Sequence, residues 1–116
     1  ENHLEMAGGD IASAIQRVRR NVSHLERIEV EVNTLEQVKK SLKAGADAIL
    51  LDNMNLEETQ KSVKLAKGYP VLLEASGNIT LETVRPVAET GVHLISVGAI
   101  THSVSALDLS LIIERI

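Results

Sequence analysis

The chain has 116 residues, with 12 Lys and Arg against 16 Asp and Glu, which gives a formal net charge of −4. This length allows one domain at most, and the absence of cysteine excludes disulfides, thiolate metal sites and a cysteine nucleophile. No apolar stretch is long enough to span a membrane, and an acidic chain with one aromatic residue lacks the positive field and stacking surfaces of nucleic-acid-binding proteins. We therefore expect a cytoplasmic protein that binds neither membranes nor nucleic acids.

Four short aliphatic runs predict buried parallel strands. They are Ile28–Val32, Ala48–Leu51, Val71–Leu73 and Leu94–Val97. The segments between them have the apolar spacing of amphipathic helices, the first with Asp10 as a candidate N-cap and the second with a capping box of Thr34 and Gln37. Pro86 predicts a kink, a late start or a short irregular turn in the last helix, and residues 107–111 predict an extended segment, with a helix as the alternative.

An internal repeat with an offset of 46 residues supports an array of strand–helix units. Residues 34–38 (TLEQV) recur as 80–84 (TLETV), and residues 45–49 (GADAI) recur as 91–95 (GVHLI). Four such units form either a small open α/β sheet or half of a (β/α) barrel, and the repeat favours the half-barrel. The fold class expected is therefore α/β, with four parallel strands alternating with helices. Since the chain starts at Glu1 without Met, we expect a fragment or a processed segment.

The first predicted strand carries two carboxylates on one face. Strict alternation in residues 28–32 turns the aliphatic side chains toward the helices and Glu29 and Glu31 toward the opposite face, which in a barrel is the interior. A buried carboxylate without a partner is costly, so Glu31, nearer the C-terminal mouth, is expected to meet a metal, a cation or ligand hydroxyls. The alternative is an edge strand whose carboxylates face water. For Glu29, a water-facing position or a structural pairing is together as favoured as a functional role.

Polar residues follow the aliphatic runs, at the carboxyl ends of the predicted strands. These ends should meet at one edge of the sheet, and parallel α/β folds bind ligands at this edge. Glu31 and Asp52, with Glu74 as a further candidate, form an acidic half suited to sugar hydroxyls, to Mg²⁺ or to a developing positive charge.

The other half of this predicted site consists of Ser76, Gly77 and Gly98, where backbone N–H groups can hold a phosphate, and His102 is near enough in sequence to reach it. Each glycine taken alone is also explained by a tight turn. A sugar phosphate would satisfy both halves. Asp47 and His93 precede their strands, at the opposite end of the sheet, where a role in stability is the favoured interpretation.

Several blocks together resemble the quinolinate phosphoribosyltransferase family, over the whole chain. They are Glu1-Asn2-His3, Ile28–Val32, Leu50–Met54, Leu73–Gly77, Ser96–Ser103 and Ala106–Leu111. The resemblance implies that residues 1–116 are the C-terminal portion of a TIM-like (β/α)-barrel domain in an enzyme that acts as a homodimer or higher homo-oligomer. It implies phosphoribosyl transfer in NAD biosynthesis, from phosphoribosyl pyrophosphate to quinolinate with Mg²⁺, giving nicotinate mononucleotide, pyrophosphate and CO₂.

The resemblance also implies roles for the residues of the predicted site. Glu31 and Asp52 are expected to hold the ribose hydroxyls and, with Mg²⁺, to stabilise an oxocarbenium-like transition state. The expected 5′-phosphate site consists of Ser76, Gly77 and Gly98, with His102 beside it.

Three departures from the family pattern concern the acceptor, the loop after the third strand and the start of the fourth strand. Family members usually have basic residues upstream of the Glu1-Asn2-His3 block that grip the quinolinate carboxylates, so we expect this chain alone to be inactive or nearly so. Asn78 and His93 stand where the family usually has Gly and Asp. The alternatives are a paralogue of the same fold with another acceptor, or a non-catalytic sugar-phosphate-binding half-barrel that pairs with itself to cover its open strand edges.

Overall fold

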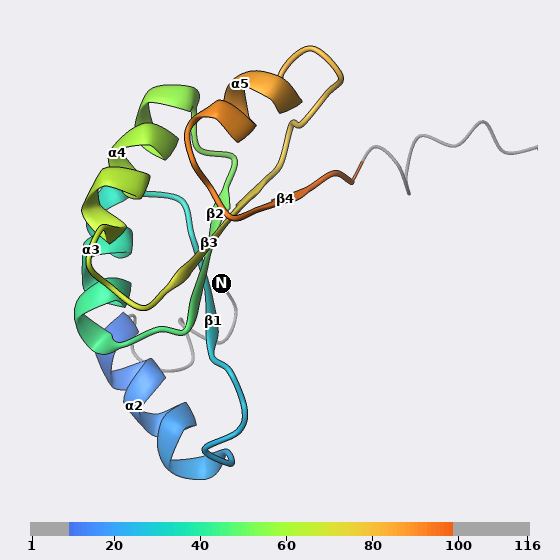
Figure 1. Ribbon diagram of the computed structural model, residues 1–116. Helices are drawn as coiled ribbons and strands as arrows, with labels where there is room; N and C mark the ends of the chain where they lie inside the picture. The colour runs from blue at the N-terminus through green and yellow to red at the C-terminus, as the bar shows by residue number, and fades with distance from the viewer. Residues whose placement is uncertain (1–9, 99–116) are drawn as a thin grey trace, which may run out of the picture.

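The computed structural model describes residues 10–98, which form a parallel sheet with helices between successive strands (Figure 1). The elements in chain order are α2 (Ile11–Asn21), β1 (Glu29–Val32), α3 (Leu35–Ala44), β2 (Ala48–Asp52), α4 (Leu56–Ala66), β3 (Leu72–Ser76), α5 (Val84–Glu89) and β4 (Leu94–Ser96). The strands lie in the order β1-β2-β3-β4, and every neighbouring pair is parallel. The predicted α/β class is thus confirmed, whereas His102 and the predicted extended segment at 107–111 lie outside the described residues.

The hydrophobic core lies between one face of the sheet and the helices α2, α3 and α4, which run along the same side of the sheet in Figure 1. Side chains of β1 alternate between exposed and buried, with Val30 and Val32 buried in the core. The largest fully buried aliphatic side chains are those of Ile49, Leu51, Leu73 and Val38. This core of branched aliphatic residues fixes which face of each strand is left for other uses.

We call the other side of the sheet the open face. Glu29 and Glu31 lie on it, as the alternation predicts, but both are exposed. The expectation that Glu31 is buried was therefore wrong for this structure. The physical reason is that the described helices cover only the aliphatic face, so these carboxylates keep their contact with water.

The helix caps follow the local sequence. Thr34 and Gln37 form the predicted capping box of α3, and Gly45 ends this helix in the left-handed conformation with φ 79°. The Asp10 side chain caps α2 by accepting the N–H of Ser13. These caps place the ends of α2 and α3 where the sequence predicts them.

Pro86 shortens the last helix, as expected. Helix α5 begins only at Val84, so Pro86 falls in its first turn, where the missing N–H would have no helical acceptor in any case. The turn before it is held by the Thr80 N–H, which donates to Thr83 Oγ1 at 2.8 Å. The late start leaves a long connection between β3 and α5.

Two strands extend further than their aliphatic runs. β2 ends at Asp52 rather than Leu51, and β3 ends at Ser76 rather than Leu73. Asp52 and Ser76 are therefore the last residues of their strands, and Glu74 lies in the middle of β3.

Within residues 10–98, no helix combines the length and the apolar content needed to cross a bilayer.

Candidate functional site

The strand register brings the predicted polar residues together on the open face. Asp52 pairs with Ser76, and Ser76 pairs with Ser96, so one row of polar side chains crosses the carboxyl ends of three strands. A second row lies two residues below it, where Leu50 pairs with both Glu31 and Glu74. Residues two apart in a strand share a face, so both rows point away from the helices.

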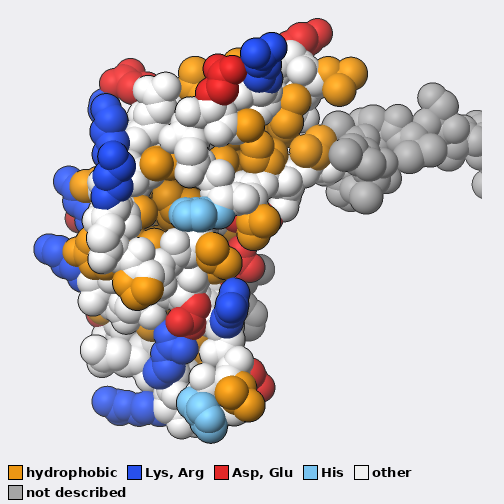
Figure 2. All heavy atoms as spheres, viewed as in Figure 1, with side chains coloured by type: hydrophobic (Ala, Val, Ile, Leu, Met, Phe, Trp, Pro, Cys, Tyr) orange, Lys and Arg blue, Asp and Glu red, His pale blue; other side chains and the backbone are white. Residues whose placement is uncertain are grey.

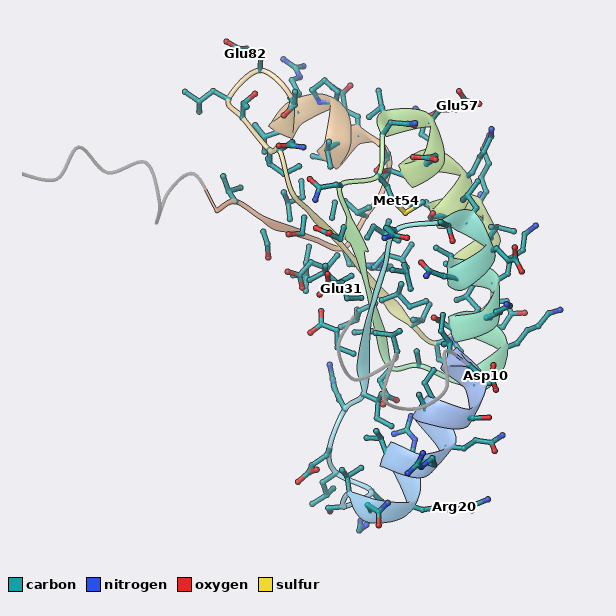
Figure 3. All side chains as sticks on the ribbon, turned by 180° about the vertical axis from the view of Figure 1, so that it is seen from behind. Asp10, Arg20, Glu31, Met54, Glu57 and Glu82 are labelled. Atoms are coloured by element: carbon teal, nitrogen blue, oxygen red, sulfur yellow. The ribbon has the colours of Figure 1, made fainter. Side chains whose placement is uncertain are left out.

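Glu31 and Asp52 are diagonal neighbours on adjacent strands. Because Glu31 pairs with Leu50 and Asp52 follows two positions later, their Cα atoms lie about 8 Å apart, from a strand spacing of about 4.8 Å and a rise of about 3.3 Å per residue. In Figure 3 Glu31 lies on the side of the sheet away from the helices. The two carboxylates are thus on the same side of the molecule and near enough to hold one ligand between them.

Glu74 has a partner within the sheet. Its carboxylate accepts a hydrogen bond from Ser96 Oγ on the neighbouring strand β4, and both residues are half-buried. Sequence reasoning did not select Ser96, although Ser96 is the one polar residue in the fourth aliphatic run. The hydrogen bond gives Glu74 a structural role. Glu74 lies two residues before Ser76, beside the row that Asp52 and Ser76 form.

The turn after β3 presents two adjacent backbone N–H groups without acceptors among the described residues. Gly77 and Asn78 both have positive φ, 84° and 53°. Within residues 10–98, neither of their N–H groups has a hydrogen-bond acceptor. Adjacent free N–H groups in such a turn bind anions such as phosphate, so the turn fits the predicted phosphate half of the site.

Asn53 is a site residue that sequence reasoning missed. It follows Asp52 directly, has φ 52°, and donates its backbone N–H to the Ser76 carbonyl oxygen at 2.9 Å. Its side chain donates from Nδ2 to Asp52 Oδ1 at 3.1 Å and accepts at Oδ1 from Asn78 Nδ2 at 2.9 Å. The available signal was weak: Asn is the non-glycine residue that best tolerates positive φ, and here it follows an acidic strand end.

Gly77 allows this arrangement because it has no side chain. A Cβ atom at this position would lie 2.2 Å from Asn53 Oδ1 and 2.6 Å from Asn53 Cγ. Together with the positive φ, this contact restricts position 77 to glycine. The turn after β3 and the Asn53 amide are therefore packed directly against each other.

A cavity of about 470 Å³ lies beside this turn, between the β2–α4 connection and the start of α5. Asn53, Gly77 and Asn78 form part of its wall, and Met54 and Pro86 contribute apolar surface. The turn therefore has free space on one side.

The charge of the described site is negative. The four strands contain no Lys or Arg, and Figure 2 shows most Lys and Arg side chains of that view over the helices and toward the α2 end. Among the described residues, no three His, Cys, Asp or Glu side chains form a metal-binding group. Mg²⁺ is usually held by one or two carboxylates together with substrate phosphates and water, so Glu31 and Asp52 fit as the protein's share of such a site.

The structure describes the last predicted site residues only in part. Gly98 is exposed and lies two residues after the end of β4, on the same edge of the sheet as Asp52 and Ser76. His102 lies outside the described residues. The structure therefore brings together Glu31, Asp52, Glu74, Ser76 and Gly77, and the position of His102 stays a prediction.

Comparisons with known proteins agree on one family. The model of the quinolinate phosphoribosyl transferase C-terminal domain matches residues 1–112. Among curated relatives, the probable nicotinate-nucleotide pyrophosphorylase [carboxylating] of Bacillus subtilis is 40% identical over 111 residues, which cover 96% of this chain and 38% of that protein. The relative of the same name from Methanocaldococcus jannaschii is 36% identical over 121 residues, covering 99% of this chain and 42% of that protein.

Solved structures agree with this result. The nicotinate-nucleotide pyrophosphorylase of Ehrlichia chaffeensis superimposes with a TM-score of 0.82 at 43% identity, over 89% of this chain and 36% of that chain. NadC of Streptococcus pyogenes gives a TM-score of 0.81 at 33% identity, over 93% of this chain and 37% of that chain. This chain spans about two fifths of the length of these relatives, and its four-stranded α/β unit is part of the TIM-like barrel that these structures have. The chain belongs to the family of quinolinate phosphoribosyltransferase C-terminal domains.

Proposed function

We propose that this chain supplies the sugar-phosphate and Mg²⁺ site of a quinolinate phosphoribosyltransferase. The reaction transfers the phosphoribosyl group of phosphoribosyl pyrophosphate to quinolinate and gives nicotinate mononucleotide, pyrophosphate and CO₂. The relatives named nicotinate-nucleotide pyrophosphorylase support this activity. Because the chain spans less than half of their length, the proposal concerns the part of the site that its own residues form.

One observation carries the proposal: Asp52 and Ser76 end neighbouring strands on the same face, directly before the turn at Gly77 and Asn78. Carboxylates at Glu31 and Asp52 suit the ribose hydroxyls and the positive charge that develops on the sugar as pyrophosphate leaves. The free N–H groups of the turn suit the 5′-phosphate. A ribose 5-phosphate group therefore has a partner for each of its polar ends.

Mg²⁺ is part of the proposal. Glu31 and Asp52 would hold the ion together with oxygens of the substrate, where it would neutralise the charge on the pyrophosphate leaving group. Within residues 10–98, no metal-binding group of three ligand side chains is found, so Glu31 and Asp52 suit an ion that arrives with the phosphates. The role of the chain's own residues is to orient the sugar against these two carboxylates.

The acceptor needs residues that the described part of the chain does not supply. Quinolinate is a dianion, and the open face carries carboxylates but no Lys or Arg on its strands. Such a face repels a dianion unless cationic groups from outside residues 10–98 surround the acceptor. We therefore expect the isolated chain to bind phosphoribosyl pyrophosphate as its Mg²⁺ complex, in which the ion offsets phosphate charge, without forming nicotinate mononucleotide.

Binding of phosphoribosyl pyrophosphate with Mg²⁺ to the 116-residue chain tests the proposal. In a ¹⁵N-edited NMR titration we expect shifts at residues 31, 52 and 76–78, and D52N should weaken binding about tenfold or more, since a hydrogen bond to a charged group is lost. E29Q is the matched control, because Glu29 lies on the same face of β1, two residues further from the site, and it should change affinity less than about twofold. Equal effects of D52N and E29Q, or shifts elsewhere on the chain, would contradict the proposed sugar-phosphate site.

A parallel assay separates sugar-phosphate binding from turnover. Formation of nicotinate mononucleotide from quinolinate by this chain alone would refute the need for additional cationic groups, and it would leave the sugar-phosphate site in place.

A further inference from the structure

We propose that Asn53 is a positioning residue that couples the Asp52 carboxylate to the anion-binding turn at Gly77 and Asn78. The inference rests on the proposed sugar-phosphate site and adds a specific connection within it. A phosphate on the turn would fix the orientation of Asp52 through this connection, and an ion on Asp52 would in return stabilise the turn.

The Asn53 amide is used at both ends, and in one orientation. The Asp52 carboxylate can only accept, so the Asn53 Nδ2 group donates to its Oδ1, at 3.1 Å. This leaves Asn53 Oδ1 to accept from Asn78 Nδ2, at 2.9 Å. The three side chains thus form a chain of two hydrogen bonds from the end of β2 to the turn after β3.

The backbone restricts the same residues. The Asn53 N–H donates to the Ser76 carbonyl oxygen at 2.9 Å, which ties the end of β2 to the end of β3. The Asn53 amide also lies against the α-carbon of Gly77, where a Cβ atom would approach Oδ1 to 2.2 Å. Since this contact is tight, a shift of the turn requires a shift of the amide.

Coupling follows from these contacts. A phosphate bound by the N–H groups of Gly77 and Asn78 would fix the turn, and through the two hydrogen bonds it would fix the Asp52 carboxylate. Such coupling is reciprocal for binding, and values of about fivefold or more are typical. We expect inorganic phosphate to raise the affinity of the chain for Mg²⁺ by about fivefold or more, and Mg²⁺ to raise the affinity for phosphate equally.

The test uses inorganic phosphate and Mg²⁺ as probes on the 116-residue chain and its variants N53G and N78G. Glycine accepts the positive φ of positions 53 and 78 without strain, so both variants should fold. N78G removes the side chain that orients Asn53 and leaves Asp52 and the backbone N–H groups in place. N33G is the matched control, because Asn33 directly follows β1 as Asn53 follows β2.

In the wild-type chain and in N33G, phosphate should shift both the amide resonances of residues 77–78 and the side-chain carboxyl resonance of Asp52. In N53G and N78G the turn should still respond while the Asp52 response disappears, and the effect of phosphate on Mg²⁺ affinity should fall below about twofold. The double variant N53G/N78G should lose no more of the phosphate effect on Mg²⁺ affinity than either single variant, because both substitutions break the same connection.

Two results would overturn the positioning role and leave the sugar-phosphate site standing. One is an Asp52 response that persists in both variants. The other is a full enhancement of Mg²⁺ affinity in both variants, which would mean that phosphate and the ion interact directly. A wild-type chain whose turn does not respond to phosphate would overturn the proposed function as well.

Discussion

Asp47 holds three elements together at the end of the sheet opposite the site. Its carboxylate accepts the Ile28 N–H at 2.8 Å, and it forms an ion pair with Arg19 of α2 at 2.8 Å. Arg19 also donates to the Gly45 carbonyl oxygen at 2.9 Å. The hydrogen bond from Ile28 and the Arg19 guanidinium hold the pKa of Asp47 below its ordinary value of 3.8. This geometry confirms the structural role predicted for Asp47.

The lowered pKa of Asp47 predicts how acid destabilises the chain. A group whose pKa is lower in the folded than in the unfolded state stabilises the fold above the unfolded value, and this contribution disappears as the pH falls through 3.8 toward the folded value. In D47N the amide oxygen can still accept the Ile28 N–H, but the charge is gone. We expect D47N to be less stable than the wild type in urea unfolding at pH 6, and the difference to shrink by pH 3.

The pKa of Asp10 is also lowered, by hydrogen bonds from Ser13, and that of Glu57 is lowered by the hydrogen bond and charge of the Lys61 ammonium. The wild type and D47N should therefore both lose some stability in acid. E36Q controls for the removal of an exposed carboxylate, that of the Glu36–Lys40 pair. A difference between wild type and D47N that is the same at pH 6 and pH 3 would contradict the assigned cause.

The residues of the site divide by how far away their partners are in the sequence. Glu31, Asp52 and Ser76 were predictable because alternation and strand ends are local properties. Asn53 and Ser96 were not, because their roles depend on Asn78 and Glu74, which are 25 and 22 residues away. The exposure of Glu31 in an edge strand was only the alternative, since it depends on what covers the sheet rather than on the strand itself.

The residues directly before β2 and β4, Asp47 and His93, lie 46 residues apart, as the internal repeat does, and they make equivalent contacts. Asp47 precedes β2 and accepts the N–H of Ile28 with its side chain, while its own N–H donates to the Ile28 carbonyl oxygen. His93 precedes β4 and does the same to Leu73: its Nδ1 accepts the Leu73 N–H at 3.0 Å, and its N–H donates to the Leu73 carbonyl oxygen at 2.9 Å. Carboxylate and imidazole thus serve as the same acceptor at equivalent places, which confirms the structural role predicted for His93.

This equivalence predicts the effect of substituting His93. H93A leaves the Leu73 N–H without its acceptor and should lower the free energy of unfolding by about 1 kcal/mol. H93D restores an acceptor like that of Asp47 and should stay within about 0.5 kcal/mol of the wild type. Urea unfolding at pH 7 measures both, and an H93D protein as unstable as H93A would show that the imidazole contributes through other contacts.

Whole elements were predictable where their signals are local. The capping box of Thr34 and Gln37 placed the start of α3, and Pro86 indicated the late start of α5. The length of β3 was underestimated because Glu74 and Ser76 resemble loop residues in a linear reading. In the sheet they are simply the open-face positions of a strand whose other face carries Leu73 and Ala75.

The described sheet as a whole has two edges, at β1 and β4, and one face without helices. Four parallel strands in sequential order make half of an eight-stranded barrel, and the relatives are longer by a factor of more than two. Unpaired N–H and C=O groups along such edges favour pairing with another chain. The open face adds apolar surface, since Leu94 of β4 is 51% exposed and lies in the row of Glu74.

We therefore predict that this chain self-associates, with a second copy pairing along the edge of β4 and covering Leu94. L94K places a charge where the contact would exclude water, and it should raise the dissociation constant about tenfold or more in sedimentation velocity. L81K is the matched control, because Leu81 is 96% exposed in the connection between β3 and α5, outside the sheet. Burying a lysine ammonium is costly only where water is removed, so L81K should associate like the wild type. A wild-type chain that stays monomeric at high concentration, or an equal effect of the two substitutions, would show that a second copy does not pair along this edge.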